Sequence, residues 1–166
     1  GIWGTDATVV MKDAAEIRSA TAYAALGGAI LTDASNVVVL KDRAAIRDAF
    51  APFGGCVLLW FFGVADVSGN VTLERCTSGG GAGIIAYSAS QLFISGDVTI
   101  REAHSETVAG VLVWNYATGV IAGNARIEDC YSSYAAGALA GSEGASLTLM
   151  DDARIVRNAG RPGGVQ

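Results

Sequence analysis

The stretch "GGAIL" at residues 27–31 decides the fold, because glycine followed by a short apolar run returns at a fixed interval. It returns as "GGCVL" (54–58), "AGIIA" (82–86), "AGVLV" (109–113) and "AGALA" (136–140). The second glycines of these stretches are 27, 28, 27 and 27 residues apart, and Gly164 follows after a further 27. A period of this length is typical of repeat architectures such as solenoids.

Two further columns of residues return in every repeat, at steps of 27 to 29 residues. One aliphatic column is Ile17, Ile46, Leu73, Ile100, Ile127 and Ile155, each followed three positions later by a small residue: Ala20, Ala49, Cys76, Ala103, Cys130 and Asn158. A second aliphatic column lies six residues earlier: Met11, Leu40, Val67, Ile94, Ile121 and Leu149. The short segments between the two aliphatic columns hold Gly-Asn, Gly-Asp or Asp pairs, which favour tight turns with positive φ.

Each repeat therefore predicts three short strands, since its apolar segments are brief and rich in Val, Ile and Leu. We predict an all-β fold: a right-handed parallel β-helix of about six coils of 27–28 residues, with three short strands per coil. Equivalent strands of successive coils would stack about 4.8 Å apart. Residues 1–166 are expected to form a single solenoid segment that is part of a longer chain.

The charged residues support this register. The residue after each aliphatic of the first column gives Arg18, Arg47, Glu74, Arg101 and Glu128, and the next residue gives Asp48, Arg75, Glu102, Asp129 and Arg157. Stacked by coil, most neighbours in these columns have opposite charge, which is favourable between adjacent strands. The register thus predicts a ladder of ion pairs on one outer face.

Two of the motifs carry a resemblance to a known family. "GGAI" (27–30) and "IVRN" (155–158) resemble the GGA[ILV] and FxxN tetrapeptides of the middle repeats of polymorphic outer membrane proteins. The other five repeats have Ala or Cys where that family has Asn. The resemblance implies a pectin-lyase-like β-helix with an adhesive role, located outside the cell or on its surface.

Composition excludes several classes of protein. The chain is 51% hydrophobic and 16% charged, which excludes a disordered tail. A net charge of −5 with only two lysines argues against a nucleic-acid groove. The longest apolar stretch, residues 56–65, is too short to span a bilayer. We therefore expect neither nucleic acid nor a membrane span.

Three cysteines, Cys56, Cys76 and Cys130, have no CxxC spacing, so we expect neither a zinc site nor a disulfide framework. Cys76 and Cys130 lie two coils apart in the small-residue column. That places them roughly 9–10 Å apart, too far for a disulfide. Both are predicted to be buried free thiols.

Catalytic and cofactor sites have weak support. The single histidine, His104, lies near Glu102 and Glu106, and we interpret it as a solvated loop residue rather than a general base. "GGGAG" (79–83) precedes a strand-like segment and not the helix that a phosphate-binding loop needs. We expect no enzyme activity, no cofactor and no metal. The alternative is a carbohydrate-binding or polysaccharide-cleaving β-helix.

The strand after each repeat glycine is apolar on both faces, whereas a strand with one face in water should alternate. The inward set could be Ile30, Val57, Ile85, Leu112 and Leu139. The predicted interaction face is then Ala29, Leu31, Cys56, Leu58, Trp60, Ile84, Ala86, Val111, Val113, Ala138 and Ala140. The sequence does not decide which parity faces inward. It also leaves open whether the outer face is covered by the chain's own segments or by a partner.

The function that we expect is a structural or adhesive scaffold. Its apolar sheet would pack against another protein chain, further repeats of the same chain or a neighbouring copy, and its surface could also contact glycans. Asn70 in "NVT" is a candidate N-glycosylation acceptor at one of the turns.

Overall fold

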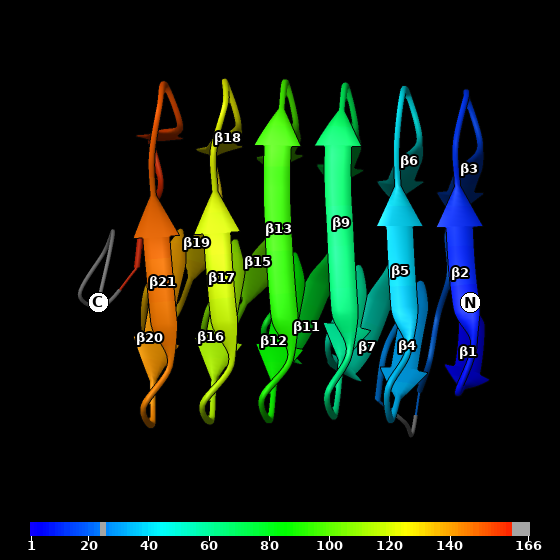
Figure 1. Ribbon diagram of the computed structural model, residues 1–166. Coiled ribbons are helices and arrows are strands. Elements are labelled where there is room, and N and C mark those ends of the chain that lie inside the picture. The colour runs from blue at the N-terminus through cyan, green and yellow to red at the C-terminus, as the bar shows by residue number, and fades with distance from the viewer. Residues whose placement is uncertain (24–25, 161–166) are drawn as a thin grey trace.

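The chain winds into six coils stacked along one axis, from β1 and β2 at one end to β20 and β21 at the other (Figure 1). The computed structural model describes residues 1–23 and 26–160. Within these residues all regular structure is β-strand, and each strand pairs in parallel with its equivalents in the adjacent coils. The predicted all-β parallel solenoid of about six turns is confirmed.

Four sheets run along the solenoid. Sheet A contains β1 (Ile2–Thr5), β4 (Ile30–Asp33), β8 (Val57–Leu59), β12 (Ile84–Tyr87), β16 (Val111–Trp114) and β20 (Leu139–Ser142). Sheet B contains β2 (Thr8–Met11), β5 (Val37–Leu40), β9 (Val64–Gly69), β13 (Gln91–Gly96), β17 (Thr118–Ile121) and β21 (Ser146–Leu149). Sheet C contains β3 (Glu16–Arg18), β6 (Ala45–Arg47), β10 (Thr72–Glu74), β14 (Thr99–Arg101), β18 (Arg126–Glu128) and β22 (Arg154–Val156).

Sheet D is an addition to the three predicted strands per coil. It contains β7 (Phe50–Phe53), β11 (Thr77–Gly80), β15 (His104–Ser105) and β19 (Tyr131–Ser132). β11, β15 and β19 are rich in Ser and Gly, and β7 contains Pro52, so these short strands have residues that are uncommon in strands. The coil-to-coil stacking of the other sheets brings them into register.

Sheets B and C keep the predicted columns without a shift. In sheet C the aliphatic residues from Ile17 to Ile155 are Cα partners in series, and in sheet B those from Met11 to Leu149 are as well. The turn between the two sheets has positive φ in every coil, at Asp13, Asp42, Gly69, Gly96, Gly123 and Asp151. Aspartate and glycine both tolerate this conformation, which explains why the turns mix the two.

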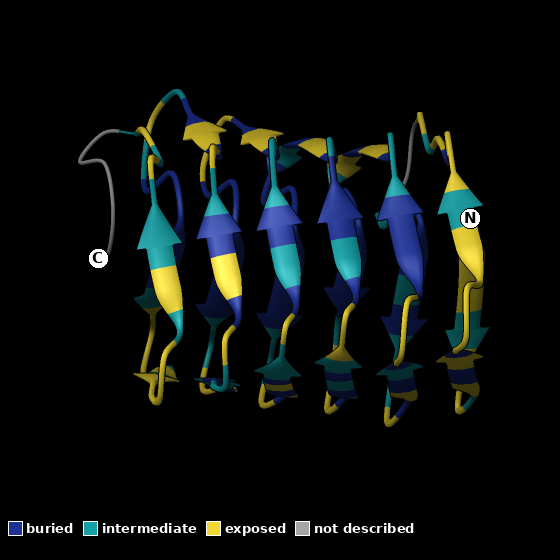
Figure 2. Ribbon diagram, turned by 90° about the horizontal axis from the view of Figure 1, so that it is seen from above, coloured by how far each residue is buried: buried dark blue, intermediate teal, exposed yellow. Residues whose placement is uncertain are grey.

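The interior is filled by alternate residues of each strand. In β13, Leu92 and Ile94 are buried, whereas Gln91 and Phe93 are exposed. Figure 2 shows buried and exposed bands alternating along the strands. The predicted small-residue column is buried from Ala20 to Cys130. Asn158 is the last residue of this column. Its side chain accepts a hydrogen bond from the backbone amide of Cys130 (2.8 Å) and donates one to the Ile127 carbonyl (2.7 Å).

Cys56 and Cys76 form a disulfide, so the expectation of no disulfide, with Cys76 as a free thiol, is wrong. Their Cα atoms are 5.5 Å apart, within the range of a disulfide. Cys56 directly precedes β8 and Cys76 follows β10, so the bond links two corners of one coil. The spacing between equivalent positions of different coils gives no distance across a single coil, so it could not reveal this bond. Cys130 is a buried free thiol, as predicted, and burial raises its pKa to about 11.

Sheet A departs from the register that its glycines indicate. The Cα partners in series are Ile30, Val57, Ile84, Val111 and Leu139. The step of 28 residues therefore lies between Val111 and Leu139, and not between Gly55 and Gly83. The Val57 amide donates to the Gly83 carbonyl and the Cys56 amide to the Ala82 carbonyl, which aligns Gly83 with Cys56.

Candidate functional site

The predicted interaction face is divided between the two sides of sheet A. The residues that belong to the main core are Ala29, Cys56, Ile84, Ala86, Val111, Val113 and Ala138. Leu31, Leu58, Trp60 and Ala140 lie on the outer side, together with Ile85 and Leu112, which were expected to point inward. The glycine register produced this error in the coils that contain β12 and β16. In the others, the corner residue before the strand also faces the core, so alternation begins one residue later.

The outer side of sheet A is largely covered by the chain's own corners. Leu58, Ile85, Val108, Leu112, Ala136 and Ala140 form a second buried apolar cluster outside the coil. A Cβ added to Gly54 would contact Leu58 Cβ at 2.7 Å, and one added to Gly81 would contact Ile85 Cδ1 at 2.6 Å. Both glycines have positive φ, so each corner folds back over the residue four positions later. Sheets B and C keep a 27-residue spacing from the second coil to the fifth. The same spacing, applied to sheet A from Leu58, would have identified Ile85 and Leu112.

Aromatic side chains continue the outer side of sheet A. Trp60 and Tyr87 stack with ring centroids 4.6 Å apart, and Tyr87 meets Trp114 edge to face at 5.1 Å. Phe53 and Phe61 pack on Trp60 at 5.8 and 5.6 Å. We call these five residues the aromatic strip. They are only partly buried, and Phe61 keeps 37% of its surface exposed.

A hollow of about 300 Å³ lies beside the aromatic strip. Its lining residues are Phe53, Thr107, Val108, Leu112, Trp114, Ala140 and Ser142. Of the predicted interaction face, Trp60 in the strip and Leu31 stay partly accessible to solvent. Such a surface can bind another apolar surface, because aromatic rings contribute large contact areas.

Sheet C has the opposite outer chemistry, a ladder of charges in the predicted register. Glu74 is almost fully buried and contacts the guanidinium groups of Arg47 (2.5 Å), Arg101 (3.1 Å) and Arg75. At the edge of the ladder Arg75 binds both carboxylate oxygens of Asp48, and Arg157 binds those of Asp129.

These hydrogen bonds change the protonation of the carboxylates. The hydrogen bond from Arg75 lowers the pKa of Asp48, and the one from Arg157 lowers the pKa of Asp129. Arg18 lowers the pKa of Glu16 in the same way. Asp48, Asp129 and Glu16 are therefore held in their ionised, paired form.

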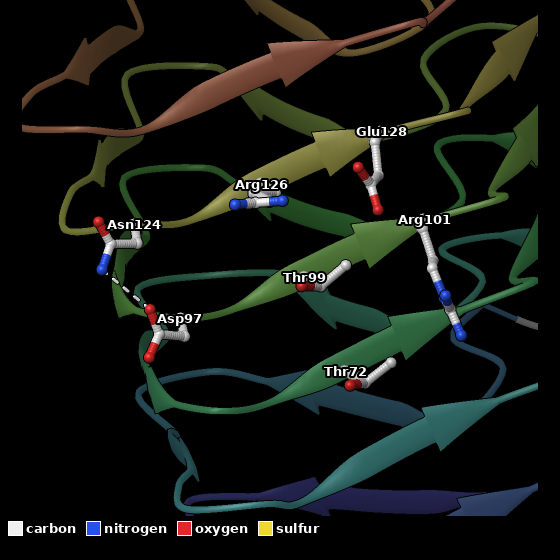
Figure 3. Close-up of a pocket in the computed structure, with 7 residues that line it drawn as sticks. All are labelled: Thr72, Asp97, Thr99, Arg101, Asn124, Arg126 and Glu128. Atoms are coloured by element: carbon white, nitrogen blue, oxygen red, sulfur yellow. Dashed lines mark hydrogen bonds between the residues drawn. The ribbon is translucent and has the colours of Figure 1, made fainter.

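A polar groove of about 600 Å³ crosses sheet C beside this ladder (Figure 3). Its lining residues are Thr72, Asp97, Thr99, Arg101, Asn124, Arg126 and Glu128. Asp97 accepts a hydrogen bond from the Asn124 amide at 2.9 Å, so this carboxylate is already partnered within the protein. The groove offers both hydrogen-bond donors and hydrogen-bond acceptors, and Arg126 adds a positive charge. It can therefore bind a polar ligand.

The remaining candidate residues lie on other parts of the coil. His104 is exposed, as predicted, but it belongs to β15 of sheet D and not to a loop, with its ring 6.1 Å from that of Tyr131. Asn70 is exposed at the turn between β9 and β10, where a glycan could project. Neither residue lies in sheet A.

Comparisons with known proteins add no relative. No family model matches the chain, and the comparisons with curated proteins and with solved structures give no match. No helix within residues 1–23 and 26–160 is long and apolar enough to cross a membrane. The same residues contain no group of three or more His, Cys, Asp or Glu side chains arranged to hold a metal ion.

Proposed function

We propose that this chain is a non-enzymatic structural or adhesive scaffold, a rigid solenoid segment that binds a protein partner or a neighbouring copy through its aromatic strip. The observation that carries the proposal is the strip itself. Five aromatic side chains are gathered on one outer surface, next to a hollow and outside the core that stabilises the coil. Protein interfaces are enriched in such aromatic residues at their centres.

The pairing of the charged side chains on sheet C supports a scaffold function over an enzymatic one. The arginines and carboxylates of sheet C are paired with one another along the solenoid, where they fix the register between coils. A catalytic group needs a carboxylate or base that is free to exchange a proton with a substrate. The ladder residues are instead held as ion pairs.

An extracellular or cell-surface location is part of the proposal. The disulfide between Cys56 and Cys76 favours an oxidising compartment. The exposed turn position of Asn70 suits a glycan. The "GGAI" and "IVRN" tetrapeptides support kinship with the repeats of polymorphic outer membrane proteins, which are adhesive.

Photo-crosslinking tests the proposed partner surface. A photoreactive phenylalanine analogue replaces Phe61 in the aromatic strip or, as a matched control, Phe93 on the outer side of sheet B. These two side chains are 37% and 43% exposed. In the native assembly we expect crosslinks to protein from position 61 and few from position 93. Equal yields from the two positions, or none from position 61, would reject the partner surface.

The polar groove of sheet C favours a second candidate, a polysaccharide-cleaving β-helix. Arg101 and Arg126 could hold the carboxylate of an acidic sugar, with Asp97 or Glu128 beside the bond to be cleaved. Release of new reducing ends from a polyuronate, abolished by Arg126→Ala, would support this candidate. No release would leave the scaffold as the function.

A further inference from the structure

We infer that the outer face of sheet D binds a ring of a neutral saccharide, in a slot one coil wide. Phe50, Thr77 and His104 are Cα partners in three successive coils, and all three side chains point outward. Pro52 and Glu106 are exposed on either side of Gly79 in the same way. The middle coil thus presents only a threonine and a glycine between two coils with larger side chains.

The dimensions of this slot suit a single ring. Phe50 and His104 are two strand spacings apart, roughly 9.6 Å. That span leaves room for one ring between their side chains at van der Waals contact of about 3.5–4.0 Å on each side. The groove over these residues has a volume of about 480 Å³.

Both walls and the floor are supported by neighbouring groups. The Phe50 ring lies 6.5 Å from that of Tyr23, and the His104 ring lies 6.1 Å from that of Tyr131. Beneath the slot the buried hydroxyl of Ser78 accepts a hydrogen bond from the Gly80 amide at 3.1 Å. The backbone of the floor is therefore fixed before any ligand arrives, which reduces the entropy cost of binding.

The chemistry of the slot fits a hydroxyl-bearing, uncharged ring. The rings of Phe50 and His104 can contact the C–H groups of a sugar, while the Thr77 hydroxyl and the Glu106 carboxylate can bind its hydroxyls. Glu106 and the net charge of −5 disfavour an acidic sugar. This inference does not depend on the aromatic strip, because the slot and the strip have no residue in common.

His104 is the only histidine in the chain, so its imidazole proton resonances report on this slot without any labelling. The experiment titrates the chain with neutral hexasaccharides of glucose, mannose, galactose and xylose, and with a hexauronate as the acidic probe. A tyrosine-rich peptide serves as the protein probe. We expect at least one neutral hexasaccharide to shift the His104 resonances in a saturable way, and the hexauronate and the peptide to leave them unchanged.

Two tryptophan variants show where binding occurs. Thr77→Trp fills the slot and should weaken the binding at least about tenfold, the loss that corresponds to roughly 1.4 kcal/mol. Thr118→Trp adds the same side chain at another exposed strand position, in β17, and should bind like the unmodified chain. Circular dichroism and thermal melting check that both variants fold.

Three results would overturn the inference. The first is the absence of any His104 shift with all four neutral hexasaccharides at millimolar concentration. The second is a shift that Thr77→Trp leaves intact. The third is a response to the peptide or the hexauronate alone. A failed crosslink at Phe61 would reject the partner surface and leave this result untouched.

Discussion

Sheets A and C hold adjacent coils together with opposite outer chemistries. Outside sheet C, arginines alternate with carboxylates, and Glu74 contacts three guanidinium groups. Outside sheet A, Leu58, Ile85 and Leu112 stack under corner segments of their own chain. Charges distinguish one register from another, because a slip of one residue brings like charges together. An apolar column buries a similar area in several registers. It therefore stabilises the solenoid but does not determine which register the strands adopt.

The largest effect that separates the two sheets is expected from Ile85→Ala. The Ile85 side chain is fully buried although it lies outside the coil. Its truncation should lower the free energy of unfolding by about 2–5 kcal/mol, as for a core residue. Phe93→Ala, on the exposed outer side of sheet B, is the control and should change it by about 0.5 kcal/mol or less. If urea unfolding gives equally small changes for both, the corners do not cover sheet A.

The disulfide connects the two sheets within one coil. Cys56 directly precedes strand β8 of sheet A, and Cys76 follows strand β10 of sheet C. Replacing both cysteines with alanine should lower the free energy of unfolding by about 2–4 kcal/mol. Cys130→Ala, in the same column but without a bond, should cost less. Thiol titration of the denatured, unreduced protein should find one free thiol. Three free thiols would refute the bond.

Glu74→Gln weakens the ladder at its most buried point. It removes the charge that three arginines share, and should lower the free energy of unfolding by about 1.5–3 kcal/mol, the worth of a hydrogen bond to a charged group. Asp129→Asn at the exposed edge should cost clearly less, because solvent screens the ion pair between Asp129 and Arg157. Chemical denaturation of both variants measures the difference. Equal costs would mean that burial adds nothing to the ladder.

Acid should produce the smallest effect, and only through sheet C. Asp48, Asp129 and Glu16 have lowered pKa values in the folded chain, so the unfolded chain binds protons more readily. Their contribution is present above their ordinary values, 3.8 for aspartate and 4.5 for glutamate, and is lost as pH falls through the lower folded values. The melting temperature should therefore decrease as the pH is lowered below about 4. Asp48→Asn with Asp129→Asn should flatten this dependence, and an unchanged slope would contradict the assignment.

The difference between the sheets also explains how much the sequence could predict. The columns of Ile17 and Met11 were identified correctly, because charges and turn residues with positive φ mark the same positions in every coil. Sheet A carries no such mark, since Ile84 and Ile85 are equally apolar. Its repeat glycines shift by one position between Gly55 and Gly83, while the strands do not.

The aromatic strip and the slot were beyond sequence analysis for a related reason. Trp60 lies on the outer side of sheet A, and its stack with Tyr87 and Trp114 depends on the register of that sheet. The slot depends on sheet D, whose short strands have the composition of loops. Only the stacking of whole coils brings Phe50, Thr77 and His104 together.

Engineered disulfides test the register and the outer face of sheet A most directly. On a Cys130→Ser background, Leu58→Cys is combined with either Ile85→Cys or Ala86→Cys, and the unreduced digest is examined by mass spectrometry. Leu58 and Ile85 are Cα partners on the same side, so we predict a bond in the first pair and none in the second. A bond between positions 58 and 86, with none between 58 and 85, would restore the glycine register and contradict this account of the outer face.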